Sequence, residues 1–185
     1  MYEIGVSCKK RREEKELWKE KNMEIERKFL VKKLPGQLDQ YPHDELCQAY
    51  VCTSPVIRVR KKNDEYILTL KSGGLLAREE IEMSIDESAF DHLKGKKDGM
   101  LISKTRYKIP EKDGLLIELD LFHEEYEGFR MAEVEFESVE QATAYTPPAW
   151  FGKEVTQDPR FHNSQLCNNS PRQVEAFFRV IRELS

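Results

Sequence analysis

The sequence has few cysteines and histidines, and neither type is spaced for a common metal motif or a disulfide framework. The four cysteines (Cys8, Cys47, Cys52 and Cys167) form no Cys-x-x-Cys pair, and the four histidines are scattered. This pattern excludes a zinc site of the usual spacing and disfavours a disulfide-rich secreted fold. Free thiols are typical of a reducing compartment, so we expect a cytoplasmic protein.

Long apolar runs and an excess of one charge are also absent. No run approaches the roughly 20 apolar residues of a membrane-spanning helix, and no signal-peptide core precedes a cleavage site. Charged residues make up 35% of the chain, yet the formal net charge is only -4. A basic nucleic-acid-binding protein should carry a clustered excess of lysine and arginine. We therefore expect a small-molecule partner, with neither nucleic acid nor membrane bound.

The chain, at 185 residues, is long enough for one domain with a sizeable core. We expect that domain to span residues 23–185. Residues 1–22 are expected to form a charged tail, because between Lys9 and Lys21 only Leu17 and Trp18 are apolar. An alternative interpretation is that the natural protein starts at Met23.

Short segments in which apolar and polar residues alternate predict a mainly β (α+β) fold. Turn signals such as Asn63-Asp64 and Asp113-Gly114 separate these segments, as hairpins require. Eight short strands of this kind predict a barrel or sandwich with a few covering helices. The strands are expected at residues 23–31, 47–53, 56–61, 66–71, 78–85, 101–109, 115–122 and 131–137.

Capping patterns predict the helices. Asp86 is placed to cap a short helix that ends near residue 95, and residues 138–144 are expected to form another. Ser170 and Gln173 have the spacing of a capping box at the start of a C-terminal helix. The apolar stripe of that helix, which predicts packing against the domain, consists of Val174, Phe177, Phe178, Ile181 and Leu184.

Two segments between the predicted elements have no clear period. Residues 32–46 contain prolines and a glycine, so we expect a loop with a short helix near residues 35–40. Residues 150–166 are aromatic and irregular, which predicts a packed closing loop.

The charged residues of seven predicted strands are sorted in a way that an ordinary solvated surface would not produce. Residues two apart in a strand share a face, so the charges take one face and the apolar residues take the other. We therefore expect the charged faces to face one another across a lumen, while the apolar faces pack against outer helices. The acidic pairs are Glu24/Glu26, Glu80/Glu82, Glu118/Asp120 and Glu133/Glu135, and the basic residues are Arg58/Arg60, Lys104/Arg106, Lys28 and Lys71.

A lumen with these side chains is suited to a metal-bound polyphosphate. Arginine forks and lysine ammonium groups hold phosphate oxygens. Carboxylates bind hard cations, and Mg²⁺ or Mn²⁺ held by carboxylates plus phosphate oxygens is a common arrangement. The sequence thus indicates attack at a phosphorus atom, assisted by metal and by charge stabilisation.

The segment Glu24-Ile-Glu26-Arg-Lys28 resembles the Glu-x-Glu-x-Lys signature of the CYTH superfamily, the triphosphate tunnel metalloenzymes. Further elements match in the family's order along the chain, and the resemblance covers about residues 23–166. These elements are Arg58-Val-Arg60, Thr69-Leu-Lys71, Glu80-Ile-Glu82, Lys104-Thr-Arg106, Glu118-Leu-Asp120 and Glu133-Val-Glu135.

The resemblance implies an eight-stranded antiparallel β-barrel tunnel that hydrolyses or rearranges a triphosphate with a divalent metal. The phosphate-binding residues that it implies are Lys28, Arg58, Arg60, Lys71, Lys104 and Arg106. The residues that it implies near the metal, directly or through water, are Glu24, Glu26, Glu118, Asp120, Glu133 and Glu135. Glu80 and Glu82 would line the tunnel.

The resemblance also suggests a catalytic pair. In some hydrolytic relatives a tyrosine pairs with the signature lysine to activate water, and the matching residues here are Tyr50 and Lys28. For either group to act as a base near neutral pH its pKa must be lowered, which neighbouring cations and metal would do.

The expected function is hydrolysis of a short polyphosphate, with inorganic triphosphate ahead of nucleoside triphosphates and thiamine triphosphate. One alternative is a class IV adenylate cyclase that makes cyclic AMP and pyrophosphate from ATP, although no base-recognition motif is evident. Another is a non-catalytic polyphosphate- or nucleotide-binding module, and a further one is a β-domain whose charged strands are simply solvated. Both a monomer and a homodimer are compatible with the sequence.

Overall fold

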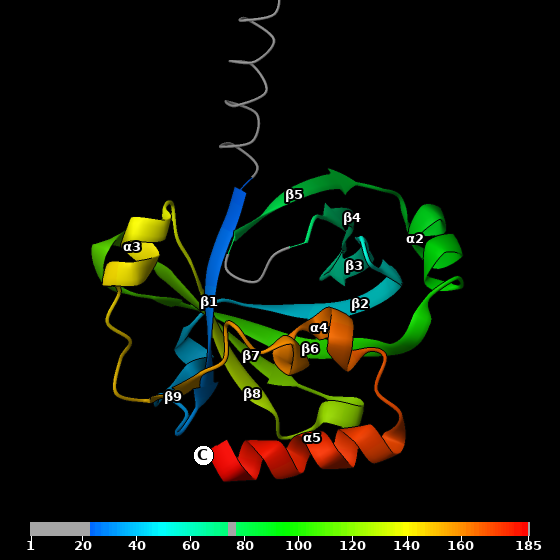
Figure 1. The fold of residues 1–185 in the computed structure, drawn as a ribbon. Helices are drawn as coiled ribbons and strands as arrows, with labels where there is room; N and C mark the ends of the chain where they lie inside the picture. The colour runs from blue at the N-terminus through cyan, green and yellow to red at the C-terminus, as the bar shows by residue number, and fades with distance from the viewer. Residues whose placement is uncertain (1–22, 74–76, 185) are drawn as a thin grey trace, which may run out of the picture.

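The computed structural model describes residues 23–73 and 77–184, which form a closed antiparallel barrel (Figure 1). Eight strands pair in the order β1-β5-β4-β3-β2-β6-β7-β8 and back to β1, so the expected eight-stranded barrel is confirmed. The tail predicted at residues 1–22 lies outside the described residues. The strands are β1 (Met23–Val31), β2 (His43–Thr53), β3 (Val56–Lys62), β4 (Glu65–Lys71), β5 (Ala77–Ser84), β6 (Asp98–Pro110), β7 (Leu116–Phe122) and β8 (Arg130–Glu135).

Strand β1 closes the barrel. One of its edges pairs with β8 along Glu26–Leu30. The other edge pairs with β5 at the N-terminal end, where Met23 lies opposite Glu79. At the C-terminal end of β1 the same edge pairs with a ninth strand, β9 (Phe151–Glu154). The first strand of the domain is therefore held by three partners.

Strand β2 begins at His43, whereas the sequence pattern predicts a loop that continues to residue 46. Asp44 interrupts the alternation of apolar and polar residues, because a charged side chain occupies a buried position where an apolar one would be expected. In the structure Asp44 is buried and forms ion pairs with Lys108 at 2.7 Å and Lys62 at 3.7 Å. The short helix expected near residues 35–40 is the 3-10 helix η1 (Leu38–Gln40).

Strand β9 lies in the segment that the sequence predicts to be irregular. It has only four residues, and two of them, Lys153 and Glu154, are exposed. A strand this short shows no alternation in the sequence, and its pairing with β1 becomes visible only in three dimensions.

The helices start where the capping patterns predict. Asp86 accepts a hydrogen bond from the Ala89 N–H at 2.7 Å, and Ser138 accepts one from the Gln141 N–H at 3.1 Å. The Ser170 N–H donates to the Gln173 side chain at 2.9 Å. Within the described residues, no helix has both the length and the apolar character needed to cross a membrane. The remaining elements are α2 (Glu87–Lys94), η2 (Lys112–Gly114), η3 (Glu124–Tyr126), α3 (Val139–Ala144), η4 (Pro159–Phe161), α4 (Asn163–Leu166) and α5 (Pro171–Leu184).

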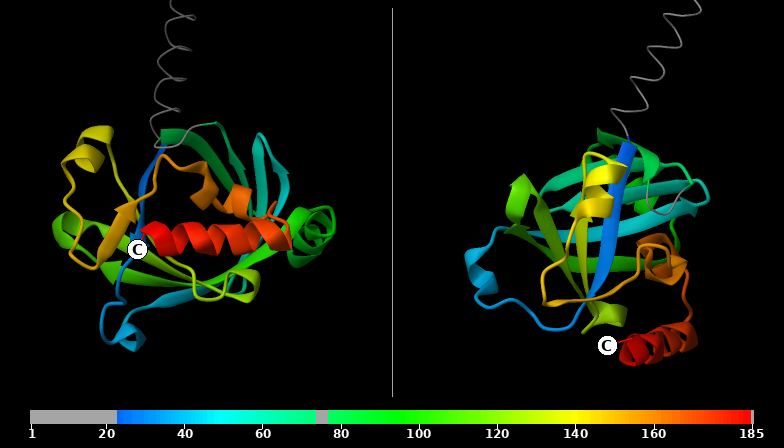
Figure 2. Two further views of the ribbon diagram at one scale, coloured as in Figure 1. Left: turned by 60° about the horizontal axis from the view of Figure 1, so that its bottom comes forward. Right: turned by 60° about the vertical axis from the view of Figure 1, so that its left-hand side comes forward.

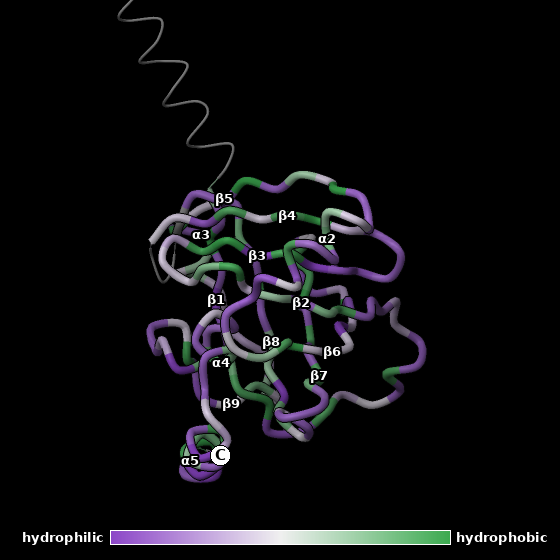
Figure 3. Tube along the Cα trace, turned by 90° about the vertical axis from the view of Figure 1, so that its right-hand side faces the viewer, coloured by the Kyte–Doolittle hydropathy of each residue, from purple (hydrophilic) through white to green (hydrophobic). Residues whose placement is uncertain are grey.

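Two apolar clusters cover parts of the outer surface of the barrel. Along the strands, hydrophobic and hydrophilic residues alternate (Figure 3). Phe29 and Val134 face outward and pack with Phe151 of β9 in one cluster. Val59 packs with Phe90 of α2 in the other. For these strands the predicted packing of the apolar faces on outer elements is confirmed.

The inward face of the barrel is charged along only part of its length. At one end the same rows continue with apolar side chains, and residues 155–184, which we call the plug, pack onto them. Helix α5 lies across this end of the barrel (Figure 2). The predicted lumen lined by charged faces does not extend to this end of the barrel, because a period of two shows which residues share a face but not what covers it. The buried cluster includes Leu30, Ile102, Phe122 and Met131 of the barrel and Phe161, Leu166, Val174 and Phe177 of the plug.

A glycine fastens the plug to β6. Gly99 has a φ of +65°, and a Cβ at this position would lie 2.0 Å from the carbonyl oxygen of Cys167. The Met100 N–H donates a hydrogen bond to that same oxygen at 2.8 Å. Only glycine lets the two backbones approach this closely.

The outer face of β4 and β5 is the second place where the predicted packing is wrong. Leu70 and Ile81 form a cross-strand pair, and each is 37% exposed, while Met83 is 49% exposed. Their side chains point away from the lumen, as the alternation requires, but they are more open to solvent than the outward residues of β1 or β8.

Phe161→Ala is expected to lower the free energy of unfolding by about 3–5 kcal/mol. Phe161 is fully buried in the plug and packs against Phe129 and Phe177. Urea denaturation followed by circular dichroism measures the change. Val139→Ala on the exposed surface of α3 is the control and should change the free energy by no more than about 0.5 kcal/mol. A loss below about 1 kcal/mol for Phe161→Ala would show that the plug is not part of the barrel's core.

Candidate active site

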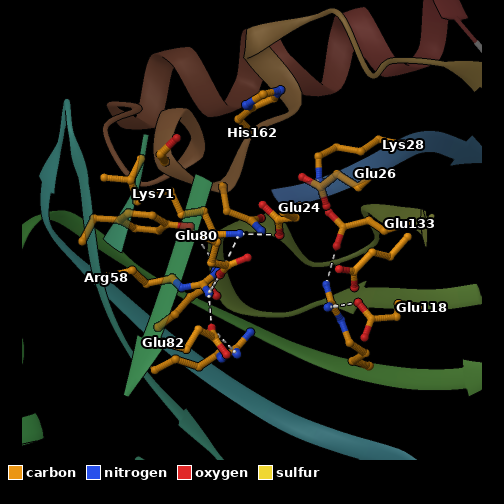
Figure 4. A pocket seen from close by; sticks show the side chains of 18 of the residues that line it. Glu24, Glu26, Lys28, Arg58, Lys71, Glu80, Glu82, Glu118, Glu133 and His162 are labelled. Carbon is orange, nitrogen blue, oxygen red and sulfur yellow. Dashed lines mark hydrogen bonds and ion pairs between the residues drawn. The ribbon is translucent and has the colours of Figure 1, made fainter. Parts of the chain in front are cut away.

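A cavity of about 470 Å³ occupies the charged part of the barrel interior (Figure 4). This volume lies in the range of small-molecule sites. All eight barrel strands contribute to its wall, and residues 162–164 of the plug complete it. The predicted site residues that line the cavity are Glu24, Glu26, Lys28, Tyr50, Arg58, Arg60, Lys71, Glu80, Glu82, Lys104, Arg106, Glu118, Glu133 and Glu135. Of the predicted set, Asp120 alone does not line it.

The register of the strands brings opposite charges together. Lys28 of β1 lies directly across from Glu133 of β8, and Lys71 of β4 lies across from Glu80 of β5. Cross-strand neighbours on one face are close enough for direct contact. Because an unpaired buried charge is costly, these pairings allow the barrel to keep a charged interior.

Glu133 joins two cations on one side of the cavity. It accepts hydrogen bonds from Lys28 Nζ at 2.5 Å and from Arg106 Nη2 at 2.5 Å. Burial favours the neutral carboxyl group, but Lys28, Arg106 and Lys104 together hold the pKa of Glu133 well below its usual range. Glu133 is therefore ionised and keeps both cations in position.

Asp120 lies behind this group and is fully buried. Its carboxylate accepts hydrogen bonds from Arg106 Nε at 2.6 Å and Nη2 at 2.7 Å, and it also contacts Lys104. Burial opposes the charge of Arg106, but Asp120, Glu118 and Glu133 raise the pKa of its guanidinium well above the usual value. Burial, with a further contribution from Arg106, lowers the pKa of Lys104. In this structure Asp120 thus orients two cations and does not line the cavity, and the metal contact that the resemblance implies for it stays a prediction.

A second group of charges surrounds Lys71. Its Nζ lies 2.5 Å from Glu24 and 3.1 Å from Glu80. Burial raises the pKa of Glu80 to about 7, and the negative charge of Glu24 adds to this although Lys71 opposes it. Two carboxyl groups here share one lysine, so a further cation would be accommodated.

Two arginines share one carboxylate on β5. Arg58 Nη2 and Arg60 Nη2 lie 3.2 Å and 3.1 Å from the same oxygen of Glu82. Arg58 also donates to Thr69 Oγ1 at 3.0 Å. Among the described residues, the buried Nε atoms of Arg58 and Arg60 have no hydrogen-bond partner. Arg58 also lies 3.5 Å from Glu80, but the two arginines retain buried N–H donors without an acceptor in the described part of the chain, which suits an anionic ligand.

The carboxylates near Glu135 fit a hard cation by their chemistry. Burial raises the pKa of Glu135, and the charges of Glu24, Glu118 and Glu26 raise it further. Oxygen ligands are those that Mg²⁺ and Mn²⁺ prefer. Within residues 23–73 and 77–184, however, no three acidic, histidine or cysteine side chains are already arranged as a metal site. A metal would be held through water, or after these carboxylates have released the cations that they now contact.

Tyr50 lies where the cavity meets the plug. It is 3% exposed, its ring belongs to the plug's apolar cluster, and its hydroxyl accepts a hydrogen bond from Gln48 Nε2 at 3.3 Å. Tyr50 and Lys28 line the same cavity. Their action as a catalytic pair stays a prediction.

The sequence pattern missed three cavity-lining residues in the plug: His162, Asn163 and Ser164. His162 lies in a bend, and the four-residue helix α4 that follows it is too short to show a period from which the direction of a side chain can be read. Gln48, two residues before Tyr50 in β2, also lines the cavity and lies outside the predicted set.

Three comparisons with known proteins agree with this geometry. The sequence model of the CYTH domain matches residues 22–161. The chain is 43% identical over 152 residues to an inorganic triphosphatase of Nitrosomonas europaea, covering 80% of this chain and 99% of that protein. It is 38% identical over 116 residues to an inorganic triphosphatase of Acetivibrio thermocellus, covering 61% of this chain and 72% of that protein. A crystal structure of an inorganic triphosphatase is similar with a TM-score of 0.61 and 39% identity, covering 80% of this chain and 96% of that one.

Glu133→Gln is expected to lower the free energy of unfolding by about 3 kcal/mol. Lys28 and Arg106 keep their buried charges in this variant but lose the carboxylate that they share. Thermal unfolding in phosphate-free buffer measures the loss, and added inorganic triphosphate should stabilise the variant more than the parent. Glu137→Gln, at an exposed position in the bend between β8 and α3, is the control. A melting temperature equal to the parent's would mean that this ion-pair group does not stabilise the barrel.

Proposed function

The chain belongs to the CYTH family, and from this membership and the charged cavity we propose that it is a metal-dependent inorganic triphosphatase. The reaction is hydrolysis of inorganic triphosphate to pyrophosphate and phosphate. The observation that carries the proposal is the enclosure of six cationic side chains together with seven carboxylates in one cavity. The relative from Nitrosomonas europaea bears the name inorganic triphosphatase, and this chain spans 99% of its length.

The six cations are the groups that we assign to the substrate. A triphosphate carries several negative charges along a short chain, and cations on opposite walls can neutralise it from several sides at once. Guanidinium groups donate in pairs to phosphate oxygens, and lysines supply point charges. The residues are Lys28, Arg58, Arg60, Lys71, Lys104 and Arg106.

The carboxylates are the groups that we assign to the metal. Triphosphatases of the family depend on a metal ion, and we propose Mg²⁺ or Mn²⁺ because the available ligands are all oxygen atoms. Such an ion neutralises charge on the phosphates and makes the phosphorus easier to attack. Asp120 acts by orienting Arg106, and the carboxylates that would hold the ion directly or through water are Glu24, Glu26, Glu118, Glu133 and Glu135.

Substrate and metal bind to opposite members of the same ion pairs. Lys71 now contacts Glu24, and Lys28 contacts Glu26 at 2.9 Å and Glu133 at 2.5 Å. Where phosphate oxygens contact the lysines, the carboxylates Glu24, Glu26 and Glu133 would be left to hold a divalent ion, which would supply positive charge in place of the lysines. Binding of the anion and of the metal should therefore be mutually favourable.

The lining of the cavity supports an inorganic substrate over a nucleotide. Its apolar contributors are Met23, Tyr50 and Val56, and the ring of Tyr50 is 3% exposed. Adenine is commonly held by stacking on an accessible aromatic face, and in the described part of the lining the rings besides Tyr50 are limited to the imidazole of His162, which is 9% exposed. A class IV adenylate cyclase and a non-catalytic binding module therefore serve as alternative outcomes of the activity test.

Phosphate release from inorganic triphosphate is expected in the presence of Mg²⁺ or Mn²⁺ and should stop when EDTA removes the metal. ATP should be hydrolysed more slowly, and no cyclic AMP should form. Cyclic AMP produced from ATP would replace this proposal with the cyclase. Stabilisation by triphosphate without turnover would leave a binding module.

Arg60→Ala is expected to lower kcat/KM for triphosphate by about 100-fold, the effect of losing about 3 kcal/mol of charged contact. Lys62→Ala is the matched control on the same strand, because Lys62 contacts Asp44 and does not line the cavity. Equal losses in both variants would contradict the assignment of Arg60 to the substrate.

Tyr50→Phe is expected to lower kcat by about 100-fold, within the range of general-base catalysis, if the Tyr50 hydroxyl helps to activate water. The change removes one oxygen from a buried ring, so KM should change little. The test measures kcat and KM of the parent and of Tyr50→Phe by steady-state kinetics over a range of pH values. A variant that turns over like the parent at every pH would remove Tyr50 from the mechanism.

A further inference from the structure

We propose that His162 is a substrate-binding residue, whose imidazole donates a hydrogen bond to the triphosphate from the side of the cavity that the plug lines. The inference rests on the proposed function. It assigns to the plug a direct contact with the substrate. The strand motifs predict binding residues on the strands but none in the plug.

The position of His162 in the cavity wall is the first support. Every other lining residue outside the segment 162–164 belongs to one of the strands β1 to β8. Residues His162, Asn163 and Ser164, which we call the roof, are the part of the wall that the plug contributes. In Figure 4, His162 lies on a separate segment above the strands that carry Lys71, Glu24 and Lys28.

The backbone of the roof is held independently of the His162 ring. Phe161 before it and Leu166 after it are both fully buried in the plug's apolar cluster. The carbonyl group of His162 accepts hydrogen bonds from the N–H groups of Gln165 at 2.8 Å and Leu166 at 2.9 Å. A change of the side chain at position 162 should therefore leave the path of the chain intact.

The His162 ring lies against the segment Val155–Thr156, which is hydrogen-bonded to the backbone of Lys28. Its Nε2 atom lies 3.5 Å from the carbonyl oxygen of Thr156. Thr156 Oγ1 accepts a hydrogen bond from the Lys28 N–H at 3.0 Å, and the Val155 N–H donates to the Lys28 carbonyl at 2.8 Å. The roof is thus fixed relative to β1, the strand that carries the phosphate-binding residue Lys28.

Helix capping does not explain the His162 ring. His162 is the residue before α4, yet its side chain makes no capping hydrogen bond. The ring is instead buried to 9% exposure beside a cavity full of charge. The ring also interacts electrostatically with Asp158 of the plug.

The chemistry of a triphosphate supplies the reason for a donor on this side. Its phosphate oxygens point in several directions around the chain, and each one that leaves water needs a donor or a metal. The strand walls supply the six cations. The roof supplies the polar side chains of His162, Asn163 and Ser164, of which only a protonated imidazole carries a positive charge. Because the Thr156 carbonyl only accepts, Nε2 carries the hydrogen that faces it, and the donor that His162 offers to the triphosphate is the Nδ1–H of the protonated imidazole.

The test compares His162→Ala and His162→Gln with the parent and with His92→Ala. His92 is exposed on α2, so its variant controls for loss of a histidine outside the cavity. In steady-state kinetics with Mg²⁺, His162→Ala should raise KM for inorganic triphosphate about tenfold or more, with kcat within about threefold of the parent. His162→Gln, which keeps an N–H donor, should recover KM to within about threefold, and His92→Ala should match the parent.

Direct binding separates the possible failures. Calorimetric titration of inorganic triphosphate into the metal-free proteins should give the same order as the KM values: the parent and His92→Ala bind most tightly, His162→Gln nearly as tightly, and His162→Ala most weakly. An active parent with an unchanged KM in His162→Ala overturns the role of His162 alone. A glutamine variant as weak as the alanine variant overturns the hydrogen-bond role, and so does a loss of kcat at constant KM. A parent that neither binds nor hydrolyses triphosphate overturns the proposed function and this inference together. Melting temperatures identify a misfolded variant. If one of His162→Ala and His162→Gln is misfolded, the KM of the other, folded variant is compared with that of the parent.

Discussion

Charge neutralisation inside a closed barrel is the constraint on which this structure depends. The strands carry acids and bases on their inner faces, and isolated buried charges of this kind would prevent folding. The register solves the problem locally, since Lys28 meets Glu133 and Lys71 meets Glu80 across neighbouring strands. The interior is therefore stable without a ligand, yet each pair can be divided between an anion and a metal.

The plug gives the other end of the barrel a different character. There the inward rows carry Leu30, Ile102 and Phe122 in place of charges, and Phe161 and Phe177 cover them. The cavity consequently has a polar wall of strands and one boundary fixed by packing. Electrostatic interactions are stronger beside such a dry boundary than in open solvent. The fold thus restricts water at the side of the cavity where Tyr50 lies.

Much of this architecture could be predicted from the alternation of residues along the strands. The pairing of Glu24 with Glu26, or Lys104 with Arg106, on one face is set by the geometry of a strand. The same rule could not reveal the plug, because Ile102 shares a face with Lys104 whether that face is wet or dry. Asp120 was grouped correctly with Glu118, but only packing shows that Arg106 separates it from the cavity. His162 lies in a loop, where no period exists to be read.

The three pairings of β1 have a consequence for the order of folding during synthesis. Lys28 and Glu133 are 105 residues apart in sequence, and Lys28 and Thr156 are 128 apart. When β1 leaves the ribosome, the strands that complete its hydrogen bonds and the segment that covers Leu30 have yet to be made. Contacts this distant in sequence slow folding and leave early strands exposed. The nascent chain must therefore keep its first strand from pairing with other chains until most of the domain has been translated.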